Sequence, residues 1–102
     1  MNFVTQYQQV SDAISAALVA ATDAKQVEAL LAERDVARSA YTKATLQQLT
    51  TNDAGMQAMS AAFTAAAQGL NNVSEATSDI VSYLGKIQTA VGWLAKIATY
   101  AV

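Results

Sequence analysis

The chain has 102 residues, of which 23 are alanine, and it contains no proline, cysteine or histidine. A chain of this length forms one domain, and without cysteine or histidine it cannot build a disulfide, a thiolate nucleophile, an imidazole base or a zinc finger. The six basic residues are scattered and the formal net charge is −2, so the sequence offers no basic stripe for a nucleic-acid backbone and excludes nucleic acid as a partner.

Helix is favoured along nearly the whole sequence. Ala, Gln and Leu are strong helix formers, the chain has only four glycines, and no stretch alternates as a strand would. The predicted fold class is all-α: a long antiparallel, coiled-coil-like helical hairpin, with a kinked three- to four-helix bundle as the alternative. We expect one domain over residues 1–102, with helical halves at 2–50 and 55–101 joined by a turn at 50–55.

The first helical half is regular only at its start. Apolar residues spaced by three and four run from Phe3 to Ala24, and the phase then slips. Thr22 and Asp23 can cap a new helix through Gln26. The pattern of this half is compatible either with one bent helix or with two consecutive helices.

The clearest break lies at the midpoint of the chain. Residues 50–55 read Thr-Thr-Asn-Asp-Ala-Gly, which places N-cap residues and a glycine between two apolar patterns. Such a cluster is typical of a helix-helix turn. A hairpin folded here would place Lys25 of the first half beside Asp79 of the second.

The second half carries an apolar stripe whose members alternate in steps of three and four. A heptad of this kind packs against a partner helix in a left-handed supercoil. The predicted core or interface stripe consists of Met56, Met59, Phe63, Leu70, Val73, Ile80, Leu84, Ile87, Val91 and Leu94.

A competing interpretation of the second half places a break at residues 69–72. Asn72 followed by Glu75 three residues later resembles a capping box. A turn would normally reset the heptad phase, however, and Leu70, Val73 and Ile80 keep step across the region. We therefore favour one continuous helix, with a kink as a variant.

Further apolar side chains flank the stripe near the C-terminus. The candidate contacts with a partner or a membrane are Val81, Tyr83, Trp93, Ile97 and Tyr100. One partner helix cannot cover them all. Four helices of this chain can wrap around them, or they can form an oligomer interface rich in favoured anchor residues. A lone hairpin with an alanine-rich core would be marginally stable, which favours the oligomer.

The membrane alternative is restricted by charge. The segment 80–102 is long enough to span a bilayer but contains Lys86 and Lys96, each costing about 2.5 to 3.5 kcal/mol near the bilayer centre. A spanning helix is therefore disfavoured. An amphipathic helix lying on the membrane surface stays open as an alternative.

Few groups in the sequence carry chemistry. A di-metal site in a helical bundle needs Glu-x-x-His pairs, and the chain has no histidine. Glu75 and Asp79 share a predicted helix face, where a solvated pair is favoured over paired catalytic carboxylates. The sequence also lacks nucleophile-elbow and phosphate-loop motifs. We expect no catalytic residues, no metal site, no cofactor and no small-molecule substrate.

Two glycines, Gly85 and Gly92, recur seven residues apart on the polar side of the last predicted helix. Each costs a helix about 1 kcal/mol relative to alanine. Either the two glycines simply destabilise the helix, or they mark positions where the backbone of another subunit approaches closely.

The composition, low charge and midpoint turn resemble two groups of small bacterial helical proteins exported without a cleaved signal. These are the WXG100 proteins and the needle or filament subunits of type III secretion. The sequence departs from both, because its only tryptophan is Trp93 instead of part of a central Trp-x-Gly, and its turn has no proline. No site residue is carried over from either family.

We expect a non-enzymatic, self-associating helical protein, a subunit of an oligomer or filament, with a bacterial secretion or surface assembly as the setting that the resemblance implies. Its expected partner is itself or another helical protein. One alternative is a membrane-active protein that docks its C-terminal helix on a bilayer, and another is a small helical inhibitor or immunity-type binding partner. The N-terminus does not read as a cleaved signal peptide, so we expect a cytoplasmic location or signal-independent export.

Overall fold

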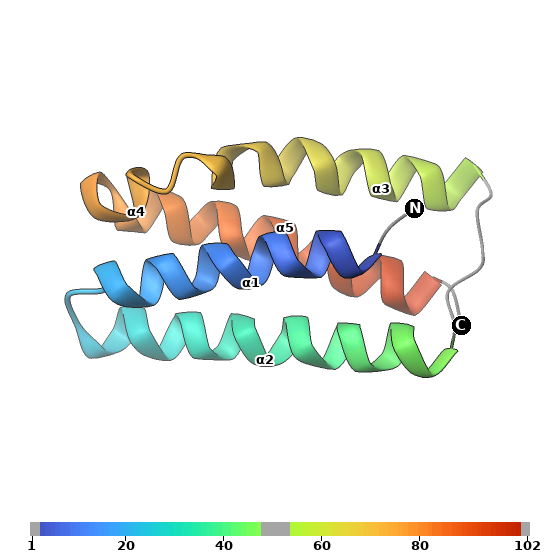
Figure 1. Ribbon diagram of the computed structural model, residues 1–102, viewed down its shortest axis with the longest axis horizontal. Helices are drawn as coiled ribbons and strands as arrows, with labels where there is room; N and C mark the ends of the chain where they lie inside the picture. The colour runs from blue at the N-terminus through green and yellow to red at the C-terminus, as the bar shows by residue number, and fades with distance from the viewer. Residues whose placement is uncertain (1–2, 48–53, 101–102) are drawn as a thin grey trace.

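The computed structural model describes residues 3–47 and 54–100, and every regular element in these ranges is helical. The all-α prediction is confirmed: the helices pack as a compact bundle (Figure 1). In chain order the elements are α1 (Phe3–Ala20), α2 (Ala24–Gln47), α3 (Ala54–Ala67), the short 3₁₀ helix η1 (Gln68–Asn71), α4 (Glu75–Ser78) and α5 (Ile80–Tyr100).

The four long helices lie side by side and alternate in direction, so that α2 and α5 run the same way (Figure 1). The last helix, α5, is the centre of the bundle, because it packs against α1, α2 and α3. Within the described residues α2 and α3 do not contact each other. In Figure 1, α1 lies in front of α5, with α3 above and α2 below. The far broad face of the molecule is therefore formed by α3, α5 and α2, with α5 in the middle.

The first half of the chain forms two consecutive helices, as one of its two interpretations predicted. The Gln26 backbone N–H donates to Asp23 Oδ1 at 2.8 Å, and Gln26 Oε1 accepts from the Thr22 backbone N–H at 2.8 Å. These reciprocal bonds satisfy amides that the start of a helix leaves unpaired. The predicted cap at Thr22 and Asp23 is confirmed, and it lets α2 reverse and pack against α1.

The Asp23 cap gives a direct prediction for stability. Asp23→Ala removes the acceptor of the Gln26 amide and is expected to lower the free energy of unfolding by about 0.5 to 2 kcal/mol. Urea unfolding followed by circular dichroism measures this loss. Asp12→Ala on the exposed side of α1 is a control of matched charge, and an equal loss in both variants would assign the effect to net charge instead of capping.

The second half is not one continuous helix, and that prediction is wrong. The chain leaves α3 after Ala67 and turns through η1 and α4 before α5 begins at Ile80, so that α3 and α5 form an antiparallel pair (Figure 1). The heptad phase survives the reversal because both arms bury their apolar face in the same core. A heptad spacing that continues through the second half therefore does not show that the second half is one helix.

Three contacts hold the connection between α3 and α5. The Tyr83 hydroxyl donates to the Leu70 carbonyl oxygen at 2.9 Å in the interior. Lys86 Nζ lies 2.7 Å from Glu75 Oε1. The Lys86 stem passes so close to Gly69 that a Cβ there would lie 2.8 Å from Lys86 Cδ. Glycine at position 69 therefore leaves room for the lysine to reach its carboxylate.

The register expected from a hairpin is also wrong. Lys25 and Asp79 form no ion pair, and the ion pair present within the described ranges is Lys86–Glu75. The reason is that α2 pairs with α1 in antiparallel fashion and runs parallel to α5. Asp79 instead accepts the Ser82 backbone N–H at 3.2 Å, at the start of α5. Most of the predicted turn at 50–55 lies outside the described residues, and α3 begins at Ala54.

The core is completed within a single chain. The accessible surface of 5582 Å² is close to the roughly 5500 Å² expected for a folded monomer of this mass. The marginal stability argued for a lone hairpin does not apply, because the two breaks allow α1, α2 and α3 to surround α5. The largest fully buried side chains are Tyr83, Phe63, Ile14, Leu30, Met56, Ile87, Leu94, Ile97, Val10 and Val91.

Glu33 of α2 is half-buried, and burial raises the pKa of its carboxyl above the ordinary value of 4.5, because the charged form loses hydration. The protonated Glu33 carboxyl therefore stabilises the folded protein fully at pH values below its unfolded-state pKa. This stabilisation is lost as the pH rises through the raised folded-state pKa. We expect Glu33→Gln to raise the free energy of unfolding near neutral pH by up to about 0.5 kcal/mol. Urea unfolding repeated in acid should show no such gain, and a gain that persists there would point to packing instead of ionisation.

Candidate functional site

The predicted stripe of the second half divides between the core and the surface. Met56, Phe63, Leu70, Ile87, Val91 and Leu94 are buried, while Met59, Ile80 and Leu84 are half-buried at the edge of the core. Val73 departs from the expectation, because its side chain is 56% exposed. It lies between η1 and α4, where the chain turns and a helical phase no longer applies.

The five candidate contact residues also divide. Tyr83 and Ile97 are fully buried, so the structure corrects their assignment as exposed contacts: both belong to the core of the chain itself. Val81 is 73% exposed and Tyr100 is 44% exposed. Trp93 is half-buried, and Lys96 Nζ lies 4.5 Å from its ring centroid, which is the geometry of a cation–π contact.

This burial bears on the membrane alternative. The apolar face of α5, including Tyr83, Ile87 and Ile97, is packed inside the bundle, so a bilayer can reach it only if the helices separate. None of the described helices is long and apolar enough to cross a membrane.

The opposite side of α5 is uncovered. A second heptad, offset from the buried one, runs along this side, and all its members are exposed except Ala95, which is half-buried. We call this set the α5 seam; it consists of Val81, Gly85, Gln88, Gly92, Ala95 and Thr99.

The two glycines of the α5 seam face open space. A Cβ built at Gly85 or at Gly92 would meet nothing within 4 Å. Gly69 is different, because Lys86 occupies the space that a side chain would need. Packing within this chain therefore explains why position 69 is a glycine. It does not explain the glycines at positions 85 and 92.

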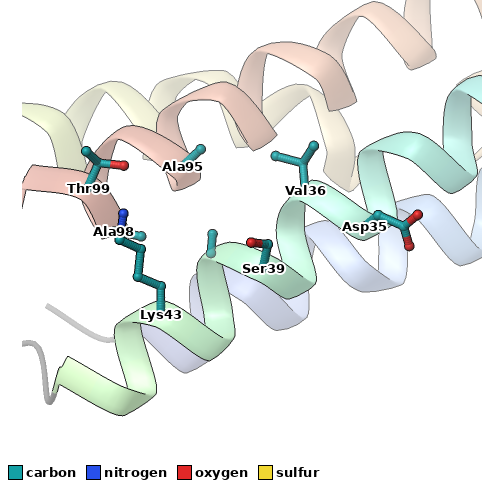
Figure 2. A pocket seen from close by; sticks show the side chains of 8 residues that line it. Asp35, Val36, Ser39, Lys43, Ala95, Ala98 and Thr99 are labelled. Carbon is teal, nitrogen blue, oxygen red and sulfur yellow. The ribbon is translucent and has the colours of Figure 1, made fainter.

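The surface is hollowed on both sides of the α5 seam. A hollow of about 360 Å³ lies between α2 and α5, and Figure 2 shows Val36, Ser39 and Lys43 of α2 beside Ala95 and Thr99 of α5, with the Lys43 side chain extended toward α5. A second hollow of about 430 Å³ lies between α3 and α5. It is lined by Met59, Ala95, Lys96, Thr99 and Tyr100.

Ala95 and Thr99 line both hollows, so the C-terminal half of the α5 seam lies between them. The first hollow is bordered by α2 and the second by α3, and these two helices do not contact each other in the described parts of the chain. Both hollows are open to the surface, whereas small-molecule sites are enclosed and bury most of the ligand.

The groups that carry chemistry are engaged in structural contacts. Glu75 binds Lys86 and Asp79 caps α5, so these two carboxylates are not arranged as a catalytic pair. Burial and the nearby charge of Glu75 raise the pKa of the Tyr83 hydroxyl, which keeps it protonated as a hydrogen-bond donor. Among residues 3–47 and 54–100, no three acidic side chains gather as a metal ion would require.

Sequence reasoning noticed Gly85, Gly92 and Val81 but did not join them into one surface. The available signal was their three-four spacing, which continues through Gln88, Ala95 and Thr99. A search for apolar periodicity misses such a pattern, because most of its members are small or polar.

Comparison of this chain with protein-family models, with curated proteins and with solved structures finds no match.

Proposed function

We propose that this chain is a non-enzymatic helical interaction protein that associates with copies of itself, as a subunit of an oligomer or filament. The observation that supports the proposal is the uncovered α5 seam, with two glycines aimed at open space between two hollows. A bacterial secretion or surface assembly is the setting proposed from the resemblance in composition.

The two glycines of the α5 seam lower the intrinsic stability of the helix. Each exposed helical glycine costs about 1 kcal/mol relative to alanine, and the packing of the chain gains nothing from Gly85 or Gly92. Glycine allows a second backbone to approach closely, which offsets the cost when another helix lies on the seam. Because the core is already complete, association adds a contact surface and is not needed for the subunit to fold.

The bilayer alternative has weaker support, because the apolar side chains that a membrane would take up are inside the bundle. An inhibitor or immunity-type function would use the α5 seam and its two flanking hollows to bind a different protein. Self-association is the function proposed, because a symmetric contact uses the same patch on both copies and requires no second protein.

The experiment is a measurement of particle mass across a wide range of protein concentration. Analytical ultracentrifugation and light scattering are expected to give a mass above the 10.7 kDa of one chain, which rises with concentration. A closed oligomer gives one larger species, while a filament subunit gives an open-ended series. A particle that stays monomeric from micromolar to millimolar concentration would contradict the proposal.

A further inference from the structure

We propose that the connection between α3 and α5 is a hinge, and that its straightening joins these helices into one, so that two copies of the chain exchange their α5 helices. Each α5 then packs against α1, α2 and α3 of the other copy, as it does within one chain in the closed form described above. Exchange of an identical element is a low-cost route to a dimer. The inference goes beyond the proposed contact on the α5 seam, because the exchange uses only the core that the chain already forms.

The heptad spacing of the second half is the first observation. The three-four steps of α3 and α5 continue through the connection at Leu70, Val73, Thr77 and Ile80. The common core accounts for an apolar stripe on each helix, but a turn can contain any number of residues, so the closed form does not require both stripes to share one phase. A single straight helix does require it, because only then do both stripes lie on the same side.

The exposure of Val73 is the second observation. Its side chain is apolar and 56% exposed in the turned connection, although its position belongs to the stripe. In a straight helix it would lie on the same side as Leu70 and Ile80, which are buried and half-buried in the closed form. Straightening therefore moves an apolar side chain from water to the packed side of the helix.

The backbone of the connection is already close to helical. Residues 68–71 and 75–78 form η1 and α4, and Ser74 also has helical angles (φ −65°, ψ −23°). The backbone departs from helical angles at Asn72 (φ −89°, ψ 77°) and at Asp79 (φ −152°, ψ 75°). The sequence has no proline to oppose a continuous helix. Straightening therefore needs rotation at a few residues instead of refolding of the whole segment.

One ion pair distinguishes the closed form. Lys86 Nζ lies 2.7 Å from Glu75 Oε1, across a separation of 11 residues. In a straight helix these positions are about 16 Å apart along the axis, so the pair breaks. Glu75 would then share a helix face with Asp79, four residues later, where two carboxylates repel each other. Both effects favour the turned connection, so the charge of Glu75 holds the hinge closed.

The buried face of α5 determines what an open chain binds. Straightening of the connection separates α5 from α3, beside which it lies in the closed form (Figure 1). The side chains of Ile87, Leu94 and Ile97, each 0% exposed in the closed form, then meet water. A second open copy offers the matching surface on its own α1, α2 and α3. The occupant of that surface is therefore the α5 of another copy of this chain.

A cysteine pair across α3 and α5 tests the exchange, since the natural sequence has no cysteine. Met59 and Ala95 line the same hollow between the two helices, so a short bismaleimide is expected to join the cysteines of a Met59→Cys, Ala95→Cys variant. In the closed form this reagent links two positions of one chain. In the exchanged dimer it links α3 of one chain to α5 of the other, and a dimer persists in denaturing gel electrophoresis.

We expect incubation at millimolar concentration to produce this exchanged dimer. Monomer and dimer should separate as two peaks in size-exclusion chromatography, because α5 must leave the core before it can exchange, and such opening is slow. The dimer peak should carry links between chains. A dimer peak whose links lie within single chains would overturn the exchange and would leave association through the α5 seam standing.

Val73→Pro is expected to weaken the dimer about a hundredfold or more, because a proline inside the straight helix breaks it in both copies. The closed form accepts this change. The hydrogen bonds of the turn are donated by the backbone N–H groups of residues 75–79, and the bond from Glu75 to the Asn72 carbonyl places residue 73 where turns favour proline. The midpoint of urea unfolding of the monomer, which should stay within error, shows that the fold is kept. Dimer formation equal to that of the natural chain would overturn the hinge.

Glu75→Gln is expected to strengthen the dimer about tenfold, because it removes the ion pair of the closed form and the repulsion of the straight form at both hinges. Glu28→Gln, at an exposed position of α2, makes the same change of net charge and should leave the dimer unaffected. If the natural chain and Glu75→Gln both stay monomeric, the exchange does not occur. A natural chain that stays monomeric while Glu75→Gln forms the linked dimer would support the hinge and contradict the proposed function of the natural chain.

Discussion

Ile87→Asp is expected to leave the protein without a cooperative unfolding transition. Ile87 is 0% exposed and lies on the face of α5 that the other helices surround. The substitution removes a buried aliphatic side chain, which costs about 2 to 5 kcal/mol, and buries a carboxylate that has no cation beside it. The second effect adds several kcal/mol unless the group takes up a proton. A domain of this size has about 5 to 15 kcal/mol of stability in total.

Circular dichroism during heating and urea titration measures this outcome. Gln68→Asp introduces the same charge at an exposed position and should change the free energy of unfolding by no more than about 0.5 kcal/mol. Ile87→Val keeps the apolar character and should cost about 0.5 to 1.5 kcal/mol. Equal losses in Ile87→Asp and Gln68→Asp would mean that the assignment of the buried face of α5 is wrong.

Tyr83→Ala is expected to be the second most damaging of the substitutions considered, with a loss of about 3 to 5 kcal/mol. Tyr83 is fully buried and is among the largest side chains in the core. Its ring lies in the hydrophobic core, and its hydroxyl donates to the Leu70 carbonyl at the point where the chain turns back toward α5. The variant therefore loses both packing and the fixation of the turn.

Tyr83→Phe separates these two contributions. It keeps the ring and removes the hydroxyl, so that the buried carbonyl of Leu70 loses its side-chain donor at a cost of about 1 to 3 kcal/mol. We expect hydrogen exchange to become faster in the connection 68–79, with the amides of α1 protected as before. Stability equal to that of the natural protein would show that another donor satisfies this carbonyl.

The sequence was sufficient to predict helices throughout and the first of the two breaks. Local chemistry explains the success: Thr22, Asp23 and Gln26 form a cap within five residues, and a local signal needs no knowledge of tertiary contacts. The second break was weighed at residues 69–72 and rejected in favour of a continuous helix, although the chain does turn close to that position. Its cause lies partly outside its own segment. Tyr83 and Lys86, both from α5, hold the connection.

The candidate site was predicted only in part, for a related reason. Periodicity identifies a face but does not say how many helices of the same chain will cover it. Tyr83 and Ile97 were assigned to an external contact because one partner helix could not bury them, and the bundle supplies three helices around α5 instead. The side of α5 that stays uncovered carries little apolar area, so its role could only be recognised once the positions of α2 and α3 were known.

The central position of α5 has a consequence for the thermodynamics of any contact made on its seam. Since three neighbouring helices hold this helix in place, its backbone is ordered before a partner arrives. Glycine and alanine have no side-chain rotamers to freeze, and valine and threonine have a single χ1, so Gln88 carries most of the side-chain entropy of the seam. Docking on such a surface therefore loses little conformational entropy, and the entropic cost that stays is the loss of translational and rotational freedom common to every association.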